Sequence, residues 1–328
     1  MTELQVIRRP IEGLLSDFEQ FVSRQFTTEG ELLGEMLQHA LASRGKGVRP
    51  MLVFLSSLMH LPEGRQVGRR SHLAAMLVEM IHVASLIHDD VIDEADQRRG
   101  RPSANALWQS RNAVLLGDFI LARNMSIGMQ SGQFDLVSHV ISAMTTLCEG
   151  EVLQSEVVQR QIISRERYID VIRRKTASLL AISASAGALS VGAAREEVER
   201  MHRFGELLGM AFQIQDDILD FSPEAKTGKS FYNDLREGKI TLPLLAVLER
   251  ATPERREELL GMLRQCHASE EQVEYLAAVV HSCGGVDEAR RTMLDYIEEA
   301  RRLLSHYPQS EVRDSLDSLC RYVADRDR

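Results

Sequence analysis

Two clusters of aspartates carry the clearest chemical pattern in the sequence. The first reads Asp89-Asp90-x-x-Asp93, and the second reads Asp216-Asp217-x-x-Asp220. In each cluster the first and last aspartates are four residues apart, so on a helix they lie on the same face. Like charges at that spacing repel by roughly a few tenths of a kcal/mol, and a position near a helix C-terminus adds a similar cost. The repeated arrangement therefore indicates a compensating cation.

A hard divalent cation would supply that compensation. Carboxylate oxygens that leave room for water suit Mg²⁺ when the ion is bound jointly with substrate phosphates. A single motif of this kind is also compatible with a solvated acidic helix end. Two motifs, each after an apolar helix and each before a basic loop that contains glycine, favour the metal site.

Basic residues that could hold phosphates lie near these motifs. Arg98 and Arg99 follow the first motif, and guanidinium groups offer the bidentate geometry that phosphate prefers. Lys175 precedes a run of small residues (ASLLAISASAGA) that would let other helices approach closely. The remaining candidates are Lys46, Arg49, Lys229 and Lys239. Each could be an ordinary surface cation, but together with the aspartates they predict a site for a phosphate-bearing substrate.

Helices must position these residues. Apolar residues recur with the helical period in the segments Leu32–Leu41, Leu73–Ile92, Ala113–Met129, Val137–Gln161, Arg167–Leu189, Glu197–Phe221 and Ala289–Leu304. Alternating, strand-like runs are hard to find, so the sequence predicts an all-α protein. Two irregular stretches, Gln97–Ser103 and Ser222–Gly238, each follow an aspartate motif. No change in composition marks a boundary, so we expect residues 1–328 to form a single domain.

Composition limits the functional classes. Apolar residues make up 44% and charged residues 27% of the chain, and the net charge of −9 argues against general affinity for nucleic acid or an anionic membrane. The four cysteines lie far apart, and Cys266-His267 with His281-x-Cys283 is only a weak zinc candidate. No signal peptide and no apolar window of about 18 residues is found. We therefore expect a cytoplasmic protein without stable membrane insertion.

The motifs resemble those of the trans-isoprenyl diphosphate synthases. The matching segments run through nearly the whole chain in the family's order: GKGVRP, LIHDDVIDEADQRRGRPSAN, GDFILAR, EGE, KTASLL, FQIQDDILDF and TGKSFYNDLREGKITLPLL. The resemblance implies the all-α isoprenoid synthase fold, a farnesyl diphosphate synthase-like helical bundle around a central cavity, and a homodimer. It also implies a prenyltransferase that adds isopentenyl diphosphate repeatedly to an allylic diphosphate, with three Mg²⁺ ions per active site.

The resemblance further implies roles for matching residues. Asp89, Asp93 and Asp216 would hold Mg²⁺, with Asp90, Asp217 and Asp220 in supporting roles, and Arg98 would contact the allylic diphosphate. Isopentenyl diphosphate would be held by Lys46, Arg49, His82 and Arg99. The reacting allylic group would be surrounded by Lys175, Thr176, Gln213, Lys229 and Lys239. The family often has an arginine where Gly47 stands here, and we expect this departure to have a modest effect.

Two small residues bear on product length. Ala84 and Ser85 lie about one turn before Asp89, on the face along which the growing tail should run. In the family, bulky aromatic residues at these positions block the tail and give short products. Small residues here predict a long-chain product, with octaprenyl diphosphate as the central expectation and a quinone side chain as its use. The same residues could instead simply ease helix packing.

Three other functions share parts of this pattern. A shorter-chain farnesyl or geranylgeranyl diphosphate synthase would carry the same motifs. A terpene cyclase shares the fold and one aspartate motif, but usually has an NSE/DTE-type second motif and lacks the isopentenyl-binding cations. A non-catalytic subunit of a heteromeric synthase typically lacks intact aspartate motifs, whereas both are complete here.

Overall fold

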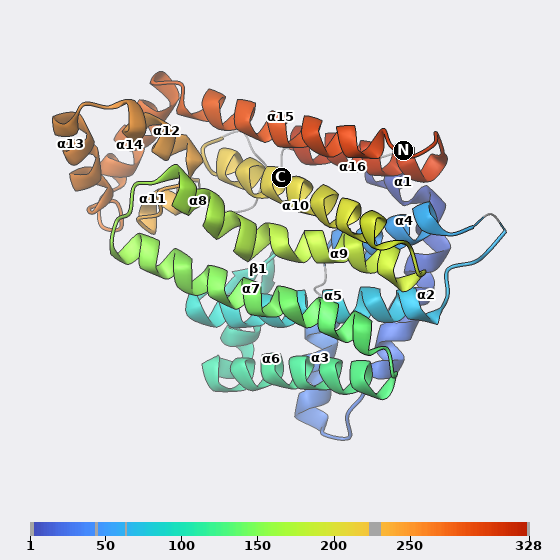
Figure 1. Ribbon diagram of the computed structural model, residues 1–328. Helices are drawn as coiled ribbons and strands as arrows, with labels where there is room; N and C mark the ends of the chain where they lie inside the picture. The colour runs from blue at the N-terminus through green and yellow to red at the C-terminus, as the bar shows by residue number, and fades with distance from the viewer. Residues whose placement is uncertain (1–2, 43–44, 63, 223–230, 327–328) are drawn as a thin grey trace. The chain divides into compact units, whose positions relative to one another are not determined.

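The computed structural model describes residues 3–42, 45–62, 64–222 and 231–326 (Figure 1). Within these ranges the regular secondary structure is helical apart from one short hairpin, which confirms the all-α prediction. In chain order the elements are α1 Glu3–Arg8, the 3-10 helix η1 Arg9–Ile11, α2 Glu12–Gln25, α3 Glu31–Ala42, α4 Val48–His60, α5 Arg69–Ile92, β1 Gln97–Arg98, β2 Arg101–Pro102, α6 Ala104–Gln130, α7 Phe134–Gln159, α8 Arg165–Ile172, the π-helix η2 Arg173–Ala177, α9 Ser178–Ser190, α10 Arg195–Asp220, α11 Asn233–Arg236, α12 Leu242–Arg250, α13 Pro253–Leu263, α14 Glu270–Ser282, α15 Gly285–Leu304 and α16 Glu311–Asp325.

These elements form two compact units. The first unit contains Met1–Met144, Leu179–Gly205 and Tyr307–Ser318, and the second contains Thr145–Ser178, Glu206–His306 and Leu319–Arg328. Helices α7, α10 and α16 each contribute residues to both units. No helix within the described ranges combines the length and the hydrophobicity that crossing a membrane requires.

Helix α5 forms the centre of the first unit. Nearly all of its side chains from Leu73 to Ala84 are buried, so it reads as a continuous apolar run with little amphipathic character. Helix α6 packs against α5 along most of its length, and the two lie side by side in Figure 1. The amide of Asn124 on α6 donates to the carbonyl oxygen of Leu77 at 2.8 Å, which ties the two helices together.

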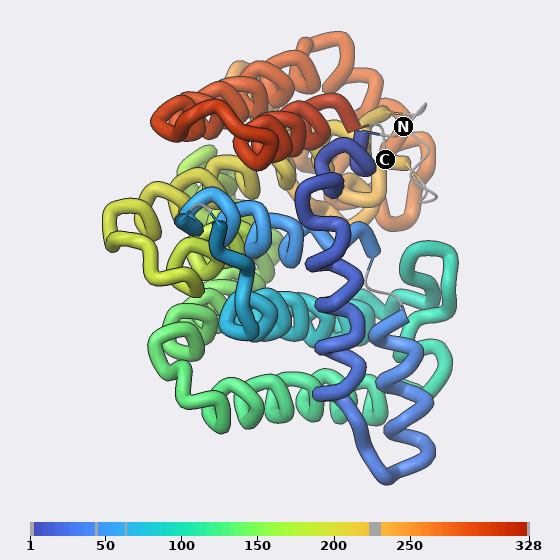
Figure 2. Tube along the Cα trace, turned by 90° about the vertical axis from the view of Figure 1, so that its right-hand side faces the viewer, coloured from blue at the N-terminus to red at the C-terminus, as the bar shows by residue number. Residues whose placement is uncertain are grey.

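The remaining helices of this unit cover α5 from other sides. Helix α2 packs against α4 and α5, and α3 packs against α5 and α6. Figure 2 shows α2 and α3, both blue, as an antiparallel pair that meets at the turn at the bottom of the view. Helix α9 carries the small-residue run, and a Cβ on its Gly187 would lie 2.3 Å from the carbonyl oxygen of Val53 on α4. The predicted close approach of helices at these small residues is therefore confirmed.

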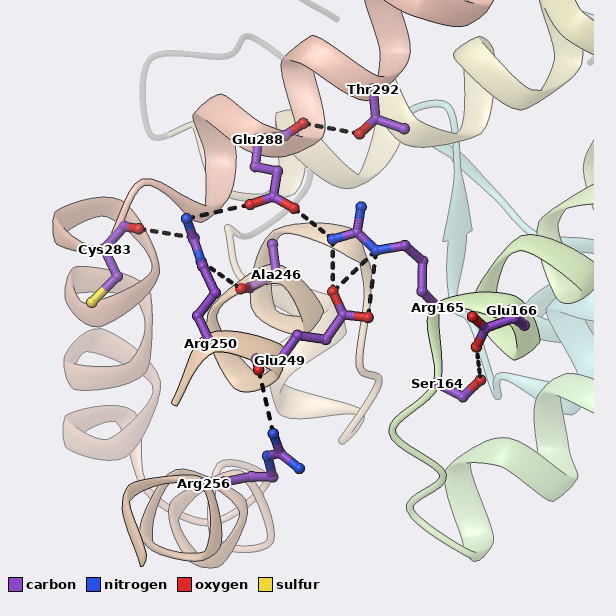
Figure 3. Close-up of polar contacts among 10 residues, drawn as sticks. All are labelled: Ser164, Arg165, Glu166, Ala246, Glu249, Arg250, Arg256, Cys283, Glu288 and Thr292. Atoms are coloured by element: carbon purple, nitrogen blue, oxygen red, sulfur yellow. Dashed lines mark hydrogen bonds and ion pairs between the residues drawn. The ribbon is translucent and has the colours of Figure 1, made fainter. Parts of the chain in front are cut away.

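The second unit is held together by an apolar cluster and an ion-pair network. Phe221, Leu248 and Leu276 belong to the buried apolar cluster. At the start of α8, Arg165 binds Glu249 of α12 at 2.7 Å and Glu288 of α15 at 2.5 Å (Figure 3). Arg250 of α12 also approaches Glu288, at 3.3 Å. These pairs attach the beginning of α8 to α12 and α15, which pack against each other.

Most of the predicted helices are confirmed, with two irregularities. The segment expected as one helix over Arg167–Leu189 is interrupted by η2, where the Ser178 N–H bonds the carbonyl oxygen of Arg173, five residues back. Helix α6 starts earlier than expected and kinks at Gln109, which has φ 66° and ψ 158°. Apolar periodicity locates helices, but it does not report a local change from α to π hydrogen bonding.

Candidate active site

The first aspartate motif forms the end of α5, and its three carboxylates have different environments. Asp93 is the C-cap, and its N–H bonds the carbonyl oxygen of Asp89 at 2.8 Å. Asp93 is exposed and Asp89 half-buried, whereas Asp90 is only 3% exposed. Arg98 Nε donates to Asp90 Oδ1 at 2.7 Å. Asp90 thus holds the arginine that follows the motif, while Asp89 and Asp93 lie nearer the surface.

The hairpin after α5 directs two neighbouring arginines to different places. Arg99 and Gly100 form its two-residue loop with φ values of 53° and 73°, as in a type I′ turn. Arginine is rare at a positive φ, and such backbone strain is found most often at functional sites. The Arg99 guanidinium lies against Gly45, where an added Cβ would be 2.2 Å from Nη1. The hairpin therefore brings Arg99 to the GKGVRP segment, while Arg98 turns back to Asp90.

A cluster of cations surrounds His82 on α5. Burial lowers the pKa of Arg49 to about 10, an effect that Glu79 opposes and Arg99 increases. Burial and then the positive charges of Arg49, Arg99 and Arg98 hold the pKa of His82 well below its usual range. His82 is therefore a neutral imidazole near pH 7, able to donate one hydrogen bond and accept another.

A buried carboxylate partly balances this cluster. Glu79 lies one turn before His82 on α5 and is 2% exposed. Burial and then the positive charge of Arg98 lower the pKa of Arg99, and the negative charge of Glu79 opposes that shift. Three guanidinium groups face two carboxylates, Glu79 and Asp90, so the cluster keeps the net positive charge that a diphosphate needs. Sequence analysis missed Glu79, although an acidic residue inside the apolar run MLVEMIHV was a signal for it.

Two cavities lie along α5. A small one of about 40 Å³ brings together His82, Asp90 and Arg98 with the side chains of Leu86 and Ile87. A larger one of about 480 Å³ lies at the beginning of the helix, at the opposite end from the aspartates, and is lined by Phe21, Arg69, Leu73 and Ile127 among others. Lys46 is exposed in the turn before α4.

The two predicted chain-length residues lie between these ends of α5. Ala84 is fully buried. Ser85 is half-buried, and its hydroxyl donates to the carbonyl oxygen of His82 at 2.9 Å. The Ser85 hydroxyl is therefore satisfied within its own helix, and neither residue presents a bulky side chain.

In the second unit, the π-helix η2 carries Lys175 and Thr176. Lys175 Nζ pairs with Glu151 Oε2 at 2.8 Å, and Arg174 pairs with Glu149 at the same distance. Between these two glutamates, a Cβ on Gly150 would lie 2.7 Å from the Lys175 backbone nitrogen. The EGE segment of α7 therefore packs closely against the bulge and pairs with two of its three basic side chains, Arg174 and Lys175. π-Bulges in helices are frequent at functional sites.

The second aspartate motif ends α10, and its middle residue is part of a buried hydrogen-bond chain. Thr176 Oγ1 donates to Gln213 Oε1 at 2.6 Å, and Gln213 Nε2 donates to Asp217 Oδ1 at 2.9 Å. The Tyr168 hydroxyl donates to Asp217 Oδ2 at 2.6 Å. Burial and the Asp234 carboxylate raise the pKa of Asp217 well above its usual range, and the two donors oppose that shift. The structure thus joins three predicted site residues, Thr176, Gln213 and Asp217, in one hydrogen-bond chain, and adds Tyr168.

Asp216 and Asp220 are engaged differently. The Asp216 side chain is 44% exposed, and its Oδ1 accepts from Arg326 Nη2 at 2.5 Å. The Arg326 guanidinium also lies 3.8 Å from the centroid of the Phe212 ring. Asp220 accepts from the backbone N–H groups of Asn233 and Asp234 at 3.0 and 3.1 Å, so it anchors the start of α11.

Of the two remaining predicted lysines, the structure describes only Lys239. Lys239 pairs with Glu237 at the end of the irregular stretch after α10. Lys229 lies outside the described residues. Arg326, like Tyr168, was missed by sequence analysis, because contacts with residues 110 positions away leave no local pattern.

The carboxylates of both motifs fit a magnesium ion in their chemistry. Across the described ranges, no three His, Cys, Asp or Glu side chains stand close enough together to enclose a metal ion by themselves. A metal ion at either motif would therefore take further ligands from water or from a substrate. Oxygen donors with open coordination positions are the arrangement that Mg²⁺ accepts beside phosphates.

Comparisons with known proteins identify the family. A family model described as polyprenyl synthetase matches residues 30–280. The chain belongs to the polyprenyl synthetase family. This polyprenyl synthetase is 36% identical over 317 residues to the heptaprenyl diphosphate synthase component 2 of Geobacillus stearothermophilus, with 95% of this chain and 96% of that protein covered. It is 32% identical over 323 residues to a geranyl-diphosphate-specific all-trans-nonaprenyl-diphosphate synthase of Rhodobacter capsulatus, with 98% of each covered.

A solved structure agrees with this assignment. The polyprenyl synthase of Caulobacter crescentus CB15, crystallised with calcium and isoprenyl diphosphate, matches the polyprenyl synthetase with a TM-score of 0.91 and 28% identity. The match covers 99% of this chain and 98% of that one. The protein is thus an all-α isoprenoid synthase and a chain-elongating prenyltransferase, which confirms the predicted family, fold and enzyme class. The terpene cyclase and the non-catalytic subunit are not favoured.

Proposed function

We propose that this polyprenyl synthetase makes a long-chain all-trans polyprenyl diphosphate, in the octaprenyl range, by repeated addition of isopentenyl diphosphate to an allylic primer. The observation that carries the product length is the pair Ala84 and Ser85, two small residues about one turn before Asp89 on the buried helix α5. The relatives named above as heptaprenyl and nonaprenyl diphosphate synthases support the same range. The expected use of the product is a quinone side chain.

Arg98 would bind the allylic diphosphate, while Lys46, Arg49, His82 and Arg99 would hold isopentenyl diphosphate. Mg²⁺ on Asp89, Asp93 and Asp216, with three ions per active site, would neutralise the charge that develops on the leaving diphosphate. The calcium and isoprenyl diphosphate bound by the Caulobacter enzyme support a divalent ion beside the substrate. Asp90, Asp217 and Asp220 would support these groups.

Departure of the diphosphate breaks the allylic C–O bond and leaves an allylic cation. The double bond of isopentenyl diphosphate attacks this cation, and a proton is then lost to form the new double bond. Lys175, Thr176, Gln213, Lys229 and Lys239 would surround the reacting group. Oriented dipoles in a dry site stabilise such a charge more than water does, and water would also quench the cation. We assign the role of base to the released diphosphate.

We further propose a homodimer in the cytoplasm, with residues 1–328 acting as a single domain. On α6, Val114, Leu115 and Met129 share one stripe and are 39%, 55% and 53% exposed, an apolar surface that a second copy would cover. The four cysteines are free thiols, which suits a reducing compartment. Helices α7, α10 and α16 each continue from one compact unit into the other, which supports a single domain.

The dimer can be tested by light scattering after gel filtration. Wild type should have the mass of two chains, and Leu115→Glu should shift it toward one. A monomeric wild type would refute the homodimer. Activity that depends on adding a different chain would instead support a heteromer, the arrangement that the word "component" indicates for the Geobacillus relative.

The activity is tested by incubating the purified protein with labelled isopentenyl diphosphate, Mg²⁺ and, in turn, dimethylallyl, geranyl, farnesyl or geranylgeranyl diphosphate. Chromatographic sizing should show products in the octaprenyl range. A chelator should stop the reaction, and added Mg²⁺ should restore it. Products that stop at farnesyl or geranylgeranyl length would establish the shorter-chain alternative, and a lack of elongation with every primer would refute the proposal.

A further inference from the structure

Tyr168 on α8 is a buried phenol that the proposed mechanism does not use. It is 7% exposed, and a buried tyrosine hydroxyl requires a hydrogen-bond partner. Its partner is Asp217 Oδ2, at 2.6 Å. Burial, followed by the nearby Asp217 charge and this hydrogen bond, holds the pKa of Tyr168 well above its usual range, so the phenol keeps its proton. Tyr168 therefore donates a permanent hydrogen bond to the middle residue of the second aspartate motif.

Asp217 uses its two carboxylate oxygens for two different donors. Oδ2 accepts from Tyr168, and Oδ1 accepts from Gln213 Nε2 at 2.9 Å. Gln213 and Asp217 are four residues apart on α10, so their side chains share a face of the helix. At 3% exposure, Asp217 is directed into the protein, in contrast to the exposed Asp216 beside it.

This arrangement sets the direction of the next two hydrogen bonds. Because Asp217 accepts from the Gln213 amide nitrogen, the amide oxygen must point the other way. That oxygen, Oε1, lies 2.6 Å from Thr176 Oγ1 and can only accept. The Thr176 hydroxyl is therefore the donor, and its proton is committed to Gln213. Its oxygen lone pairs remain for whatever lies beside Thr176.

The orientation of the Thr176 hydroxyl matters because of where Thr176 lies. It lies next to Lys175 in the π-helix η2, the segment that carries the predicted contacts to the allylic group. A hydroxyl whose proton is engaged elsewhere presents the negative end of its dipole, which stabilises a developing positive charge. A freely rotating hydroxyl would lose this preference, because its proton could turn toward the cation.

We propose that Tyr168 is a positioning residue for the prenyl transfer: through Asp217 and Gln213, it holds the Thr176 hydroxyl with its oxygen toward the allylic cation. This inference rests on the proposed function, which places the allylic group beside Thr176. In these three hydrogen bonds, Asp217 sets the orientation of the Gln213 amide, and the amide sets the orientation of the Thr176 hydroxyl. Removal of the Tyr168 hydroxyl takes away one of the two donors that hold Asp217 in place. The effect should fall on the chemical step, because the hydrogen bond of Tyr168 leads through Asp217 and Gln213 to Thr176, and not to an arginine or lysine assigned to a diphosphate.

The test compares elongation kinetics of wild type, Tyr168→Phe, Thr176→Val and the double variant. Tyr168→Phe should lower kcat about tenfold and leave KM for both substrates within about twofold, a smaller loss than removal of a direct transition-state donor. Thr176→Val should lower kcat further. Adding Tyr168→Phe to Thr176→Val should then have no further effect, because the group on which Tyr168 acts is gone. Thr176→Ser keeps the hydroxyl and should remain sensitive to Tyr168→Phe.

Tyr275→Phe is the matched control. It removes a phenol hydroxyl in the same unit, one that bonds Arg255 at the surface, and should leave kcat unchanged. Thermal unfolding of each variant checks that it is folded. If Tyr168→Phe fails to fold, Gln213→Leu breaks the chain at its next link and should show the same lack of additivity with Thr176→Val.

The outcomes separate this inference from the proposed function. If wild type elongates but Tyr168→Phe retains its kcat, or the two losses multiply in the double variant, the positioning role is refuted and the function stands. A rise in KM without a fall in kcat also refutes it. If wild type elongates no primer, the proposed function fails, and the inference fails with it.

Discussion

Replacement of Gly45 by alanine should weaken the binding of isopentenyl diphosphate by displacing Arg99. An added Cβ would lie 2.2 Å from Arg99 Nη1 and 2.4 Å from Cζ, well inside van der Waals contact. The atoms that it meets are the end of a flexible side chain, so the guanidinium should move aside while the fold is kept. Gly45 also has φ +68°, a conformation that costs an L-residue roughly 1–2 kcal/mol.

Gly47 provides a matched control two residues away. Its φ is +65°, and nothing lies within 4 Å of the position that its Cβ would take. Gly47→Ala therefore carries about the same backbone strain without touching Arg99. Both variants should lose roughly 1–2 kcal/mol of unfolding free energy, measured by urea denaturation. A difference between them in substrate binding then reports the guanidinium alone.

The size of that difference follows from the contact that is lost. A hydrogen bond to a charged group contributes about 1.5–3 kcal/mol, and each 1.4 kcal/mol is about a tenfold change in affinity. Gly45→Ala should therefore raise KM for isopentenyl diphosphate about 10- to 100-fold relative to Gly47→Ala, in steady-state assays at saturating primer. KM for the allylic primer should change little.

A third variant completes the experiment. Arg99→Ala should raise KM for isopentenyl diphosphate to a similar extent. The double variant Gly45→Ala, Arg99→Ala should have the same KM as Arg99→Ala alone, because both changes act on the Arg99 guanidinium. Equal KM values for Gly45→Ala and Gly47→Ala would refute the idea that Gly45 positions Arg99. Additive losses in the double variant would show that Gly45 acts on something else.

Three further changes are expected to have measurable effects. Ala84→Phe should shorten the main product without abolishing turnover, as seen by sizing the labelled products, and an unchanged chain length would contradict the tail path along α5. Burial raises the pKa of Glu197, but hydrogen bonds from Tyr307, Arg200 and His60 outweigh it and lower the pKa to about 2. The stability that Glu197 contributes is therefore present above pH about 4.5 and lost as pH falls toward 2. The difference in unfolding free energy between wild type and Glu197→Gln should accordingly shrink as pH falls over that range. A difference that stays constant would contradict this. Arg165→Ala should lower the unfolding free energy by about 1 kcal/mol, and by less at high salt, as measured by denaturation. The control is Arg195→Ala, which removes a single ion pair at the surface. Equal small losses in the two variants would mean that the network of Figure 3 contributes no additional stability.

The helices and the aspartate motifs were predictable because their signals are local. The apolar period in Ala289–Leu304 reports the face that α15 buries, and the apolar run within Leu73–Ile92 corresponds to α5, which is buried on nearly all sides. Both aspartate motifs end helices, as their position after apolar runs predicts. The all-α fold needed no more than this pattern.

The partners of the site residues were not predictable in the same way. Tyr168 lies 49 residues from Asp217, and Arg326 lies 110 residues from Asp216. Such contacts depend on how helices pack, and no spacing in the sequence encodes them. The resemblance gave Asp90 and Asp217 supporting roles, but the spacing of the motifs does not show that these two side chains are buried, which separates them from their neighbours.

The π-helix η2 has a consequence for how this segment can change during evolution. A bulge with hydrogen bonds between residues five apart holds one residue more than the α-helical turn that would replace it. Loss of a single residue within Arg173–Ala177 would let the helix close as a regular α-helix with α8 and α9 kept in register, and only the side chains of the bulge itself would change direction. Lys175 and Thr176 could then no longer keep both Glu151 and Gln213 as partners. The number of residues in this segment is therefore as important to these two contacts as the identities of Lys175 and Thr176.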